Sequence, residues 1–172
     1  MGFCWSVFSC IFAAVAYGLG LWLYPASPVT YFLGILIGCG LASLIHELGH
    51  LAAYRLLKLS WRRLEFACFV FRRGEGVRID TRKRFFAASC TCAYDPSVPY
   101  WRYQIALLSG SGVCFLLCAA SFIACCYVSG TLRAFLLCLG IASGLNWLSN
   151  LLPLSADRRL LKQIKQEREN LA

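Results

Sequence analysis

Two histidines and a glutamate inside an apolar stretch constrain this chain more than any other feature. His46, Glu47 and His50 lie within the stretch from Val29 to Leu57, whose composition is otherwise that of a membrane span. In a helix the two histidines are about 6 Å apart along the axis and share one face, so both imidazoles can ligate one metal ion. Glu47 follows the first histidine directly, where it can act as general base on a water molecule.

Placing these three ionisable groups inside a membrane span costs free energy, so we expect them to have a function. Ionisable side chains at membrane depth cost about 2.5–3.5 kcal/mol each on insertion scales. Three of them within five residues therefore predict a polar cavity with a function. The structural alternative is that both histidines only satisfy hydrogen bonds inside a helix bundle. Because they are the only histidines of the chain and lie in helical register, we favour metal binding.

The composition is that of an integral membrane protein. Hydrophobic residues make up 59% of the chain and charged residues 15%, against about a quarter in soluble domains. With about 20 residues per span, 172 residues hold one compact domain of about four spans and no accessory globular domain. The net charge of +9 would suggest nucleic acid as the partner of a soluble protein. Most basic residues flank apolar segments, however, so we expect no nucleic acid partner.

We therefore expect an all-α polytopic membrane protein that forms a single domain over residues 1–172. Four apolar segments are predicted to span the bilayer, at residues 3–24, 29–57, 104–128 and 132–152. The sequence Pro25-Ala-Ser-Pro28 separates the first from the second. Since no basic residue precedes the first span, it is interpreted as a retained anchor, with a cleaved signal peptide as the alternative.

Residues 58–103 are basic and strand-like, and residues 156–172 are helical in pattern. The segments Leu64–Phe71 and Val77–Asp80 flank a glycine-rich turn, which predicts a β-hairpin. Aromatic and cationic side chains mix around it, as they do at the headgroup layer, so the hairpin is expected to lie against the membrane. In residues 156–172, leucine and isoleucine are interspersed with arginine and lysine, which predicts a basic amphipathic helix on the membrane surface.

The distribution of basic residues predicts the orientation in the membrane. Positive charge follows the second and fourth spans, whereas the opposite ends carry only Arg133. Both termini are then cytoplasmic, and we expect a multi-pass protein of a bacterial plasma membrane. The second span brings the histidines to the cytoplasmic third of the bilayer, and the fourth brings Asn150 to Asp157 to the same depth.

A zinc site of this kind needs a third protein ligand and leaves the fourth position open. Only Asp157, among the acids other than Glu47, closes a span that ends at the depth of the histidines. Glu65 is the second choice. The sequence therefore predicts one Zn²⁺ per chain, held by the two histidines and an acid.

These motifs give the chain a resemblance to a known family. It is similar to the site-2 proteases, which are intramembrane zinc metalloproteases, in a small form without accessory domains. The likeness rests on His46-Glu-Leu-Gly-His50 in one span and on Asn150-Leu-Leu-Pro153 shortly before Asp157 in the last. A weaker likeness covers residues 108–112, where the family has a small-residue turn that enters its next core span.

The resemblance implies an intramembrane zinc endopeptidase that hydrolyses a peptide bond in a membrane-spanning or membrane-bound substrate. Its zinc ligands would be the two histidines and Asp157, its catalytic base Glu47, and its site-shaping residues Asn150 and Pro153. The family has glycine after the aspartate, whereas this chain has Arg158, and an arginine can pair strongly with a carboxylate. The alternative is therefore a catalytically inactive member that binds a client transmembrane segment.

Substrate binding is predicted at the hairpin. Phe69 and Val70 would lie on a strand whose free edge pairs with an unwound substrate segment, because cleavage needs an extended peptide. The alternative is that the aromatic hairpin is only a surface anchor. The predicted partners are a membrane protein or membrane-bound peptide as substrate and the lipid bilayer. A separate regulatory or adaptor protein is a third partner if the hairpin and spans do not select the substrate alone.

Overall fold

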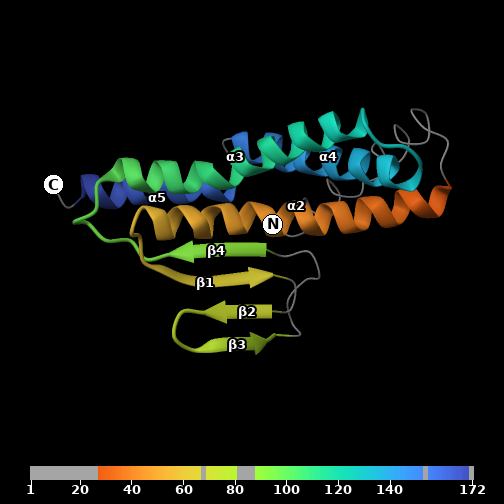
Figure 1. Ribbon diagram of the computed structural model, residues 1–172. Coiled ribbons are helices and arrows are strands. Elements are labelled where there is room, and N and C mark those ends of the chain that lie inside the picture. The colour runs from red at the N-terminus through yellow and green to blue at the C-terminus, as the bar shows by residue number, and fades with distance from the viewer. Residues whose placement is uncertain (1–26, 67–68, 81–87, 153–154, 171–172) are drawn as a thin grey trace. The chain divides into compact units, whose positions relative to one another are not determined.

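The computed structural model describes residues 27–66, 69–80, 88–152 and 155–170. The predicted first span at residues 3–24 and the predicted site residue Pro153 lie outside this part of the chain. Within it the protein is mostly helical (Figure 1), and its elements in chain order are α2 (Pro28–Leu56), β1 (Trp61–Phe66), β2 (Phe69–Arg72), β3 (Gly76–Ile79), β4 (Ala88–Cys92), α3 (Tyr100–Cys125), α4 (Gly130–Leu151) and α5 (Ala156–Glu169).

Three helical segments of the described chain are long and apolar enough to cross a membrane. They are Pro28–Leu56, Tyr100–Cys125 and the segment Gly130–Glu169. The first two lie within four residues of the spans predicted at 29–57 and 104–128, and α4 within the third lies within two residues of the span predicted at 132–152. The sequence prediction of several apolar helices is therefore confirmed for the described residues.

The chain forms two compact units, each of which contains parts of the long helices. Of the described residues, one unit contains those in the ranges 27–42 and 116–145, and the other contains those in the ranges 43–115 and 146–170. In the first unit, a β-carbon added to Gly34 would lie 3.1 Å from the Cys138 sulfur, so this glycine allows α2 and α4 to pack closely. The second unit contains the sheet and all predicted site residues that the structure describes.

The segment predicted as a β-hairpin is a four-stranded antiparallel sheet with the order β3-β2-β1-β4. The expected strand Leu64–Phe71 is wrong as a single element, because its residues belong to two strands, β1 and β2, that pair with each other. The turn between β2 and β3 is where it was predicted. Gly74 and Gly76 adopt φ values of 85° and 80° there, a left-handed region that favours glycine.

β4 was not predicted, and it makes the sheet a second layer of the fold rather than an insertion in an all-α protein. Its sequence, Ala-Ser-Cys-Thr-Cys, carries no alternation of large apolar residues. It is held by tertiary contacts, because Cys90 lies directly opposite Leu64 of β1 and both side chains are buried. In Figure 1, β4 lies beside α2, where Tyr54 belongs to the same buried cluster.

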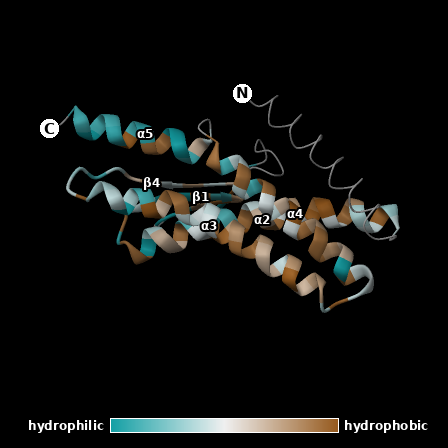
Figure 2. Ribbon diagram, turned by 90° about the horizontal axis from the view of Figure 1, so that it is seen from above, coloured by the Kyte–Doolittle hydropathy of each residue, from teal (hydrophilic) through white to brown (hydrophobic). Residues whose placement is uncertain are grey.

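The C-terminal helix α5 is amphipathic, as predicted, but its apolar side packs on the protein. Ile164 is 3% exposed in the cluster that contains Tyr54 and Tyr103, and Leu160 and Leu161 pack against the same cluster. Figure 2 shows the mainly hydrophilic colouring of the rest of α5. The centre of this face is therefore buried by core packing, and the position of α5 on the membrane surface stays a prediction.

Candidate metal centre

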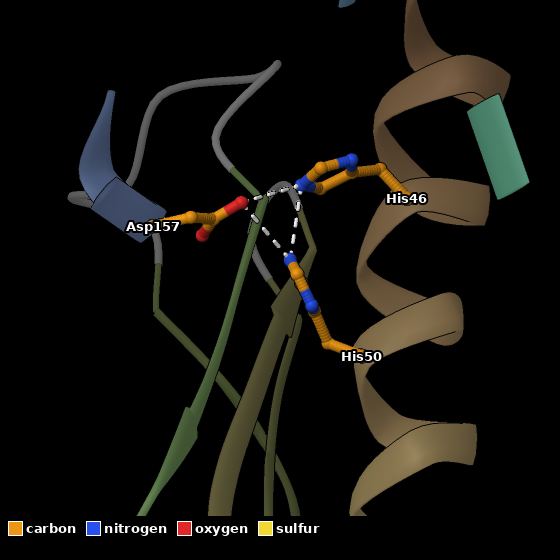
Figure 3. A group of neighbouring side chains, drawn as sticks. All are labelled: His46, His50 and Asp157. Carbon is orange, nitrogen blue, oxygen red and sulfur yellow. Dashed lines mark hydrogen bonds and ion pairs between the residues drawn. The ribbon is translucent and has the colours of Figure 1, made fainter. Parts of the chain in front are cut away.

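Two helices of the second unit bring together three groups with metal-binding atoms (Figure 3). His46 and His50 project from successive turns of α2, and Asp157 projects toward them from the first turn of α5. The Nε2 atoms of the two histidines are 3.0 Å apart. The Asp157 Oδ2 atom lies 3.4 Å from Nε2 of His46 and 3.3 Å from Nε2 of His50.

These distances fit the donor set of a zinc site. Ligand atoms about 2.0–2.1 Å from a tetrahedral Zn²⁺ lie about 3.3 Å from each other. The observed triangle has sides of 3.0, 3.3 and 3.4 Å. Within the described residues, no other set of three histidine, cysteine or acidic side chains has its ligand atoms gathered in this way. The structure therefore brings together the three residues that the sequence nominated as ligands.

The hydrogen bonds of His50 show which ring nitrogen is available to a metal. Its Nδ1 lies 2.8 Å from the backbone oxygen of Ala106 on α3. A carbonyl oxygen only accepts, so Nδ1 carries the proton, and the Nε2 of the neutral ring presents its lone pair. A hydrogen bond of this kind is typical of metal-binding histidines, because it fixes the tautomer and the ring orientation.

The Asp157 oxygen that faces the histidines is buried and needs a positive charge nearby. Oδ2 has no hydrogen-bond donor among the described residues, although it lies close to both Nε2 atoms. A carboxylate oxygen and an imidazole lone pair at this distance repel each other unless a cation lies between them. A metal ion would provide positive charge to the two imidazoles and the carboxylate together. A proton on one histidine would form a hydrogen bond to only one of the other two groups.

Local sequence explains how Asp157 reaches this position. Ser155 is the N-cap of α5, and its hydroxyl accepts a hydrogen bond of 3.2 Å from the backbone N–H of Arg158. The same hydroxyl donates to the backbone oxygen of Asn150 at 3.1 Å, which ties the start of α5 to the end of α4. The cap sets the direction of the first turn, and an acid in that turn is favoured by the helix dipole.

Gly110 on α3 makes room for the two imidazole rings. A β-carbon added at this position would lie 2.6 Å from Nε2 of His50 and 2.9 Å from Cε1 of His46. The backbone of α3 also approaches Gly49 closely, since a β-carbon there would lie 3.1 Å from the Cα of Gly110. The sequence analysis placed this glycine only in the small-residue run of residues 108–112. The structure shows that its missing side chain is part of the site.

Cys114 is a further neighbour of the site that sequence reasoning missed. Its sulfur lies 3.7 Å from Nδ1 of His46, and the side chain is fully buried. A thiol that accepts from this nitrogen leaves the Nε2 of His46 free to bind metal, as the carbonyl of Ala106 does for His50. Their spacing puts Gly110 and Cys114 one helical turn apart on the same face of α3, but this spacing alone does not show that the face meets the histidines.

Glu47 lies beside the three ligands and against the edge of the sheet. Its carboxylate is close enough to interact electrostatically with His46, His50 and Asp157. The backbone N–H of Cys90 on β4 donates a hydrogen bond toward it. The opposite edge of β4 pairs with β1, so the edge that faces Glu47 carries no neighbouring strand among the described residues. The predicted base is therefore next to the predicted ligands.

Burial, together with the nearby negative charge of Glu47, raises the pKa of the Cys90 thiol to about 12. The thiolate is the nucleophilic form, so Cys90 is expected to stay protonated and unreactive at neutral pH. We predict that iodoacetamide at pH 7.5 modifies the exposed Cys126 before Cys90 in the folded protein, as measured by peptide mass spectrometry. Equal modification of both would contradict the burial of Cys90, and unfolding should remove the difference.

Arg158 does not form an ion pair with Asp157 in the part of the chain that is described. Its side chain instead lines a small cavity of about 10 Å³ together with Asn150, Asp157 and Ser111. This is enough room for about one water molecule. The Nε atom of Arg158 is buried and has no acceptor among the described residues. The sequence allowed Arg158 to pair with Asp157 and so to compete with a metal ion. This pairing is not found among the described residues.

The other nominated residues lie elsewhere. Asn150 donates hydrogen bonds to the backbone and side-chain oxygens of Asn146, at 2.9 and 2.8 Å, and reaches the site only through the small cavity. Glu65, the second choice of ligand, pairs with Arg63 and accepts from Ser89, on the sheet face opposite Leu64. The structure therefore does not bring Glu65 to the histidines.

Phe69 and Val70 do not offer a free strand edge. They lie on β2, which pairs with β1 on one side and with β3 on the other. The strands with an open edge in the described sheet are β3 and β4. The expectation that a substrate segment pairs with the strand at Phe69 and Val70 is therefore wrong, and the available edge near Glu47 belongs to β4.

Comparison of the sequence with protein-family models, with curated proteins and with solved structures gives no match. The resemblance to the site-2 proteases accordingly rests on the sequence motifs alone.

Proposed function

We propose that this protein is an intramembrane zinc endopeptidase that hydrolyses a peptide bond in a membrane-spanning or membrane-bound substrate. The observation that carries the proposal is the triangle of two Nε2 atoms and one carboxylate oxygen with sides of 3.0–3.4 Å. Both histidines lie on α2, a helix long and apolar enough to cross a membrane, with a glutamate directly after the first of them, and Asp157 lies on α5.

In this proposal His46, His50 and Asp157 hold Zn²⁺. Bound there, the ion would supply a Lewis acid for the scissile carbonyl and for the attacking water. Glu47 accepts a proton from the attacking water and later delivers it to the leaving amine nitrogen. One carboxylate therefore makes both proton transfers of the hydrolysis. The Cys90 N–H orients this carboxylate, and Ala106 and Cys114 orient the two imidazoles.

The substrate of a site on a membrane helix has to reach it in extended form. A helical peptide keeps its carbonyls in internal hydrogen bonds, whereas a strand presents them to an enzyme. We propose that the open edge of β4 receives such a strand, since it runs beside Glu47. Substrate selection would then depend on β4 and the apolar helices, or on a separate adaptor protein.

A catalytically inactive protein that binds a client transmembrane segment is the second candidate. Its basis is a departure in sequence, since Arg158 follows Asp157 where the site-2 proteases have glycine, although the two side chains do not pair in the described structure. In such a protein the metal would have a structural role, and the β4 edge or the helices would hold the client. The two candidates differ in whether a peptide bond is broken.

We predict that the purified full-length protein, reconstituted with a set of single-pass membrane peptides, cleaves at least one of them in a metal-dependent way. Treatment with 1,10-phenanthroline should abolish cleavage, and added Zn²⁺ should restore it, because the three ligands alone supply no Lewis acid. Mass spectrometry of the products locates the cleaved bond. Metal binding without cleavage of any peptide would favour the inactive binder, and cleavage that survives complete metal removal would contradict the zinc mechanism.

A further inference from the structure

A shallow groove of about 590 Å³ lies on the sheet, apart from the metal centre. Its lining includes Trp61, Arg62, Arg63, Arg72, Arg73 and Glu75. Four of these six side chains are arginines and only one is acidic. A groove of this volume is large enough for a small ligand or for the polar part of a lipid.

The register of the sheet places the arginines directly opposite one another. Arg63 of β1 pairs with Arg72 of β2. The next position continues the pattern, because the backbone N–H of Arg73 donates to the backbone oxygen of Arg62 at 3.2 Å. Like charges directly opposite on neighbouring strands are destabilising. Successive positions of a regular strand face opposite sides of the sheet, but the register of β1 is irregular between Trp61 and Arg63, and all four arginines line the same groove.

Acidic side chains of the protein neutralise only part of this charge. Arg63 pairs with Glu65, and Arg72 pairs with Glu75 at 3.2 Å. Arg62 and Arg73 are exposed and have no carboxylate partner among the described residues. The groove thus keeps two guanidinium groups with free donors, each able to bind a phosphate oxygen pair in bidentate geometry.

The groove lies close to the end of a helix that is able to cross a membrane. α2 ends at Leu56, and the groove begins within five residues of it, at Ser60 and Trp61. Tryptophan and arginine are typical of the layer where a protein meets lipid headgroups. A phosphate group in that layer belongs to a phospholipid.

We propose that this groove binds the phosphate of an anionic phospholipid headgroup, between the pairs Arg63–Arg72 and Arg62–Arg73. The bound lipid would fix the sheet, and with it β4, against the membrane surface. The proposal concerns the sheet alone and does not depend on zinc or on proteolysis.

The test is native mass spectrometry of the full-length protein purified in detergent and offered equal amounts of phosphatidylglycerol and phosphatidylcholine. The wild type is expected to retain phosphatidylglycerol preferentially. Arg62→Gln with Arg73→Gln should reduce that preference about 25-fold, since each of the two basic side chains near an anionic surface contributes about a fivefold change. Lys165→Gln with Arg168→Gln is the matched control, because it removes the same charge from exposed positions of α5 and should leave the preference unchanged.

Three results would overturn the proposal. They are an unchanged preference in the groove variant, an equal loss in the α5 control, and displacement of the lipid by inorganic phosphate at the same concentration as by phosphatidylglycerol. The last would identify a site for free phosphate. Arg62→Lys with Arg73→Lys keeps the charge and removes the bidentate donors, so a partial loss is expected from it even if the glutamine variant unfolds.

Discussion

Replacing Glu47 with glutamine is expected to lower the rate of substrate cleavage by about 10²- to 10⁴-fold while zinc stays bound. The carboxamide has nearly the same shape as the carboxylate, but it cannot accept a proton from water. None of the three predicted ligands is changed, so the metal content should equal that of the wild type. Single-turnover cleavage of the reconstituted substrate and metal analysis of the same sample measure the two quantities.

Glu169→Gln is the matched control for this variant. Glu169 is exposed at the end of α5, where it pairs with Lys165 at 3.7 Å. An exposed pair of this kind contributes little to stability, so its loss should leave both cleavage and zinc content unchanged. Cleavage by Glu47→Gln at the wild-type rate would show that another group moves the proton, and the assignment of Glu47 would be wrong.

Replacing Gly110 with alanine is expected to abolish zinc binding, and cleavage with it. The added β-carbon would lie 2.6 Å from the Nε2 atom of His50 and 2.7 Å from its Cε1 atom, closer than atoms in contact approach. Both rings would have to turn away from the position that faces Asp157. Loss of a single outer hydrogen bond to a ligand costs about 10- to 100-fold in metal affinity, so displacement of two ligands should cost more.

Gly112→Ala provides the comparison within the same helix. A β-carbon at Gly112 would meet no atom within 4 Å, and alanine has a higher helix propensity than glycine. This variant should therefore bind zinc as the wild type does, with equal or slightly greater thermal stability. The measurement is the zinc affinity of both variants by competition with a chelator. Wild-type affinity in Gly110→Ala would mean that the rings do not occupy the described positions.

The helices could be predicted from the sequence because their signal is local. A run such as Pro28–Leu56 is apolar over its whole length, and no tertiary contact is needed to recognise it. The predicted ends of the helices were less accurate. α3 begins at Tyr100, four residues before the predicted start, since a residue such as Tyr103 is buried by the rest of the second unit rather than by lipid.

The sheet was predicted only in part because its strands depend on their partners. β3 and the glycine turn before it carry a local signal, but β4 is defined by the pairing of Cys90 with Leu64 across to β1. A one-residue difference in register would move such a strand from the buried face to the exposed one. The face of α5 had the same ambiguity, since a leucine and isoleucine stripe packs equally well on lipid or on a protein core.

In the candidate site, too, some residues could be predicted from the neighbouring sequence and others only from tertiary contacts. His46, Glu47 and His50 form one local motif, and Asp157 could be nominated from the depth at which its span ends. Gly110 and Cys114 could not be assigned, because their roles depend on how closely α3 approaches α2. Only the folded chain shows that a missing side chain makes room for the ligands.

The most direct test of the account is the number of zinc ions bound per chain, measured by mass spectrometry of metals after gel filtration, in the wild type and in Asp157→Ala. We predict one zinc in the wild type and an affinity at least about 100-fold weaker in the variant, because a ligand itself is removed. If the wild-type protein bound no zinc, the zinc proposal would be wrong. A shared proton would then have to link His46, His50 and Asp157. Unchanged affinity in Asp157→Ala would equally contradict the proposal, since the third ligand would then lie elsewhere.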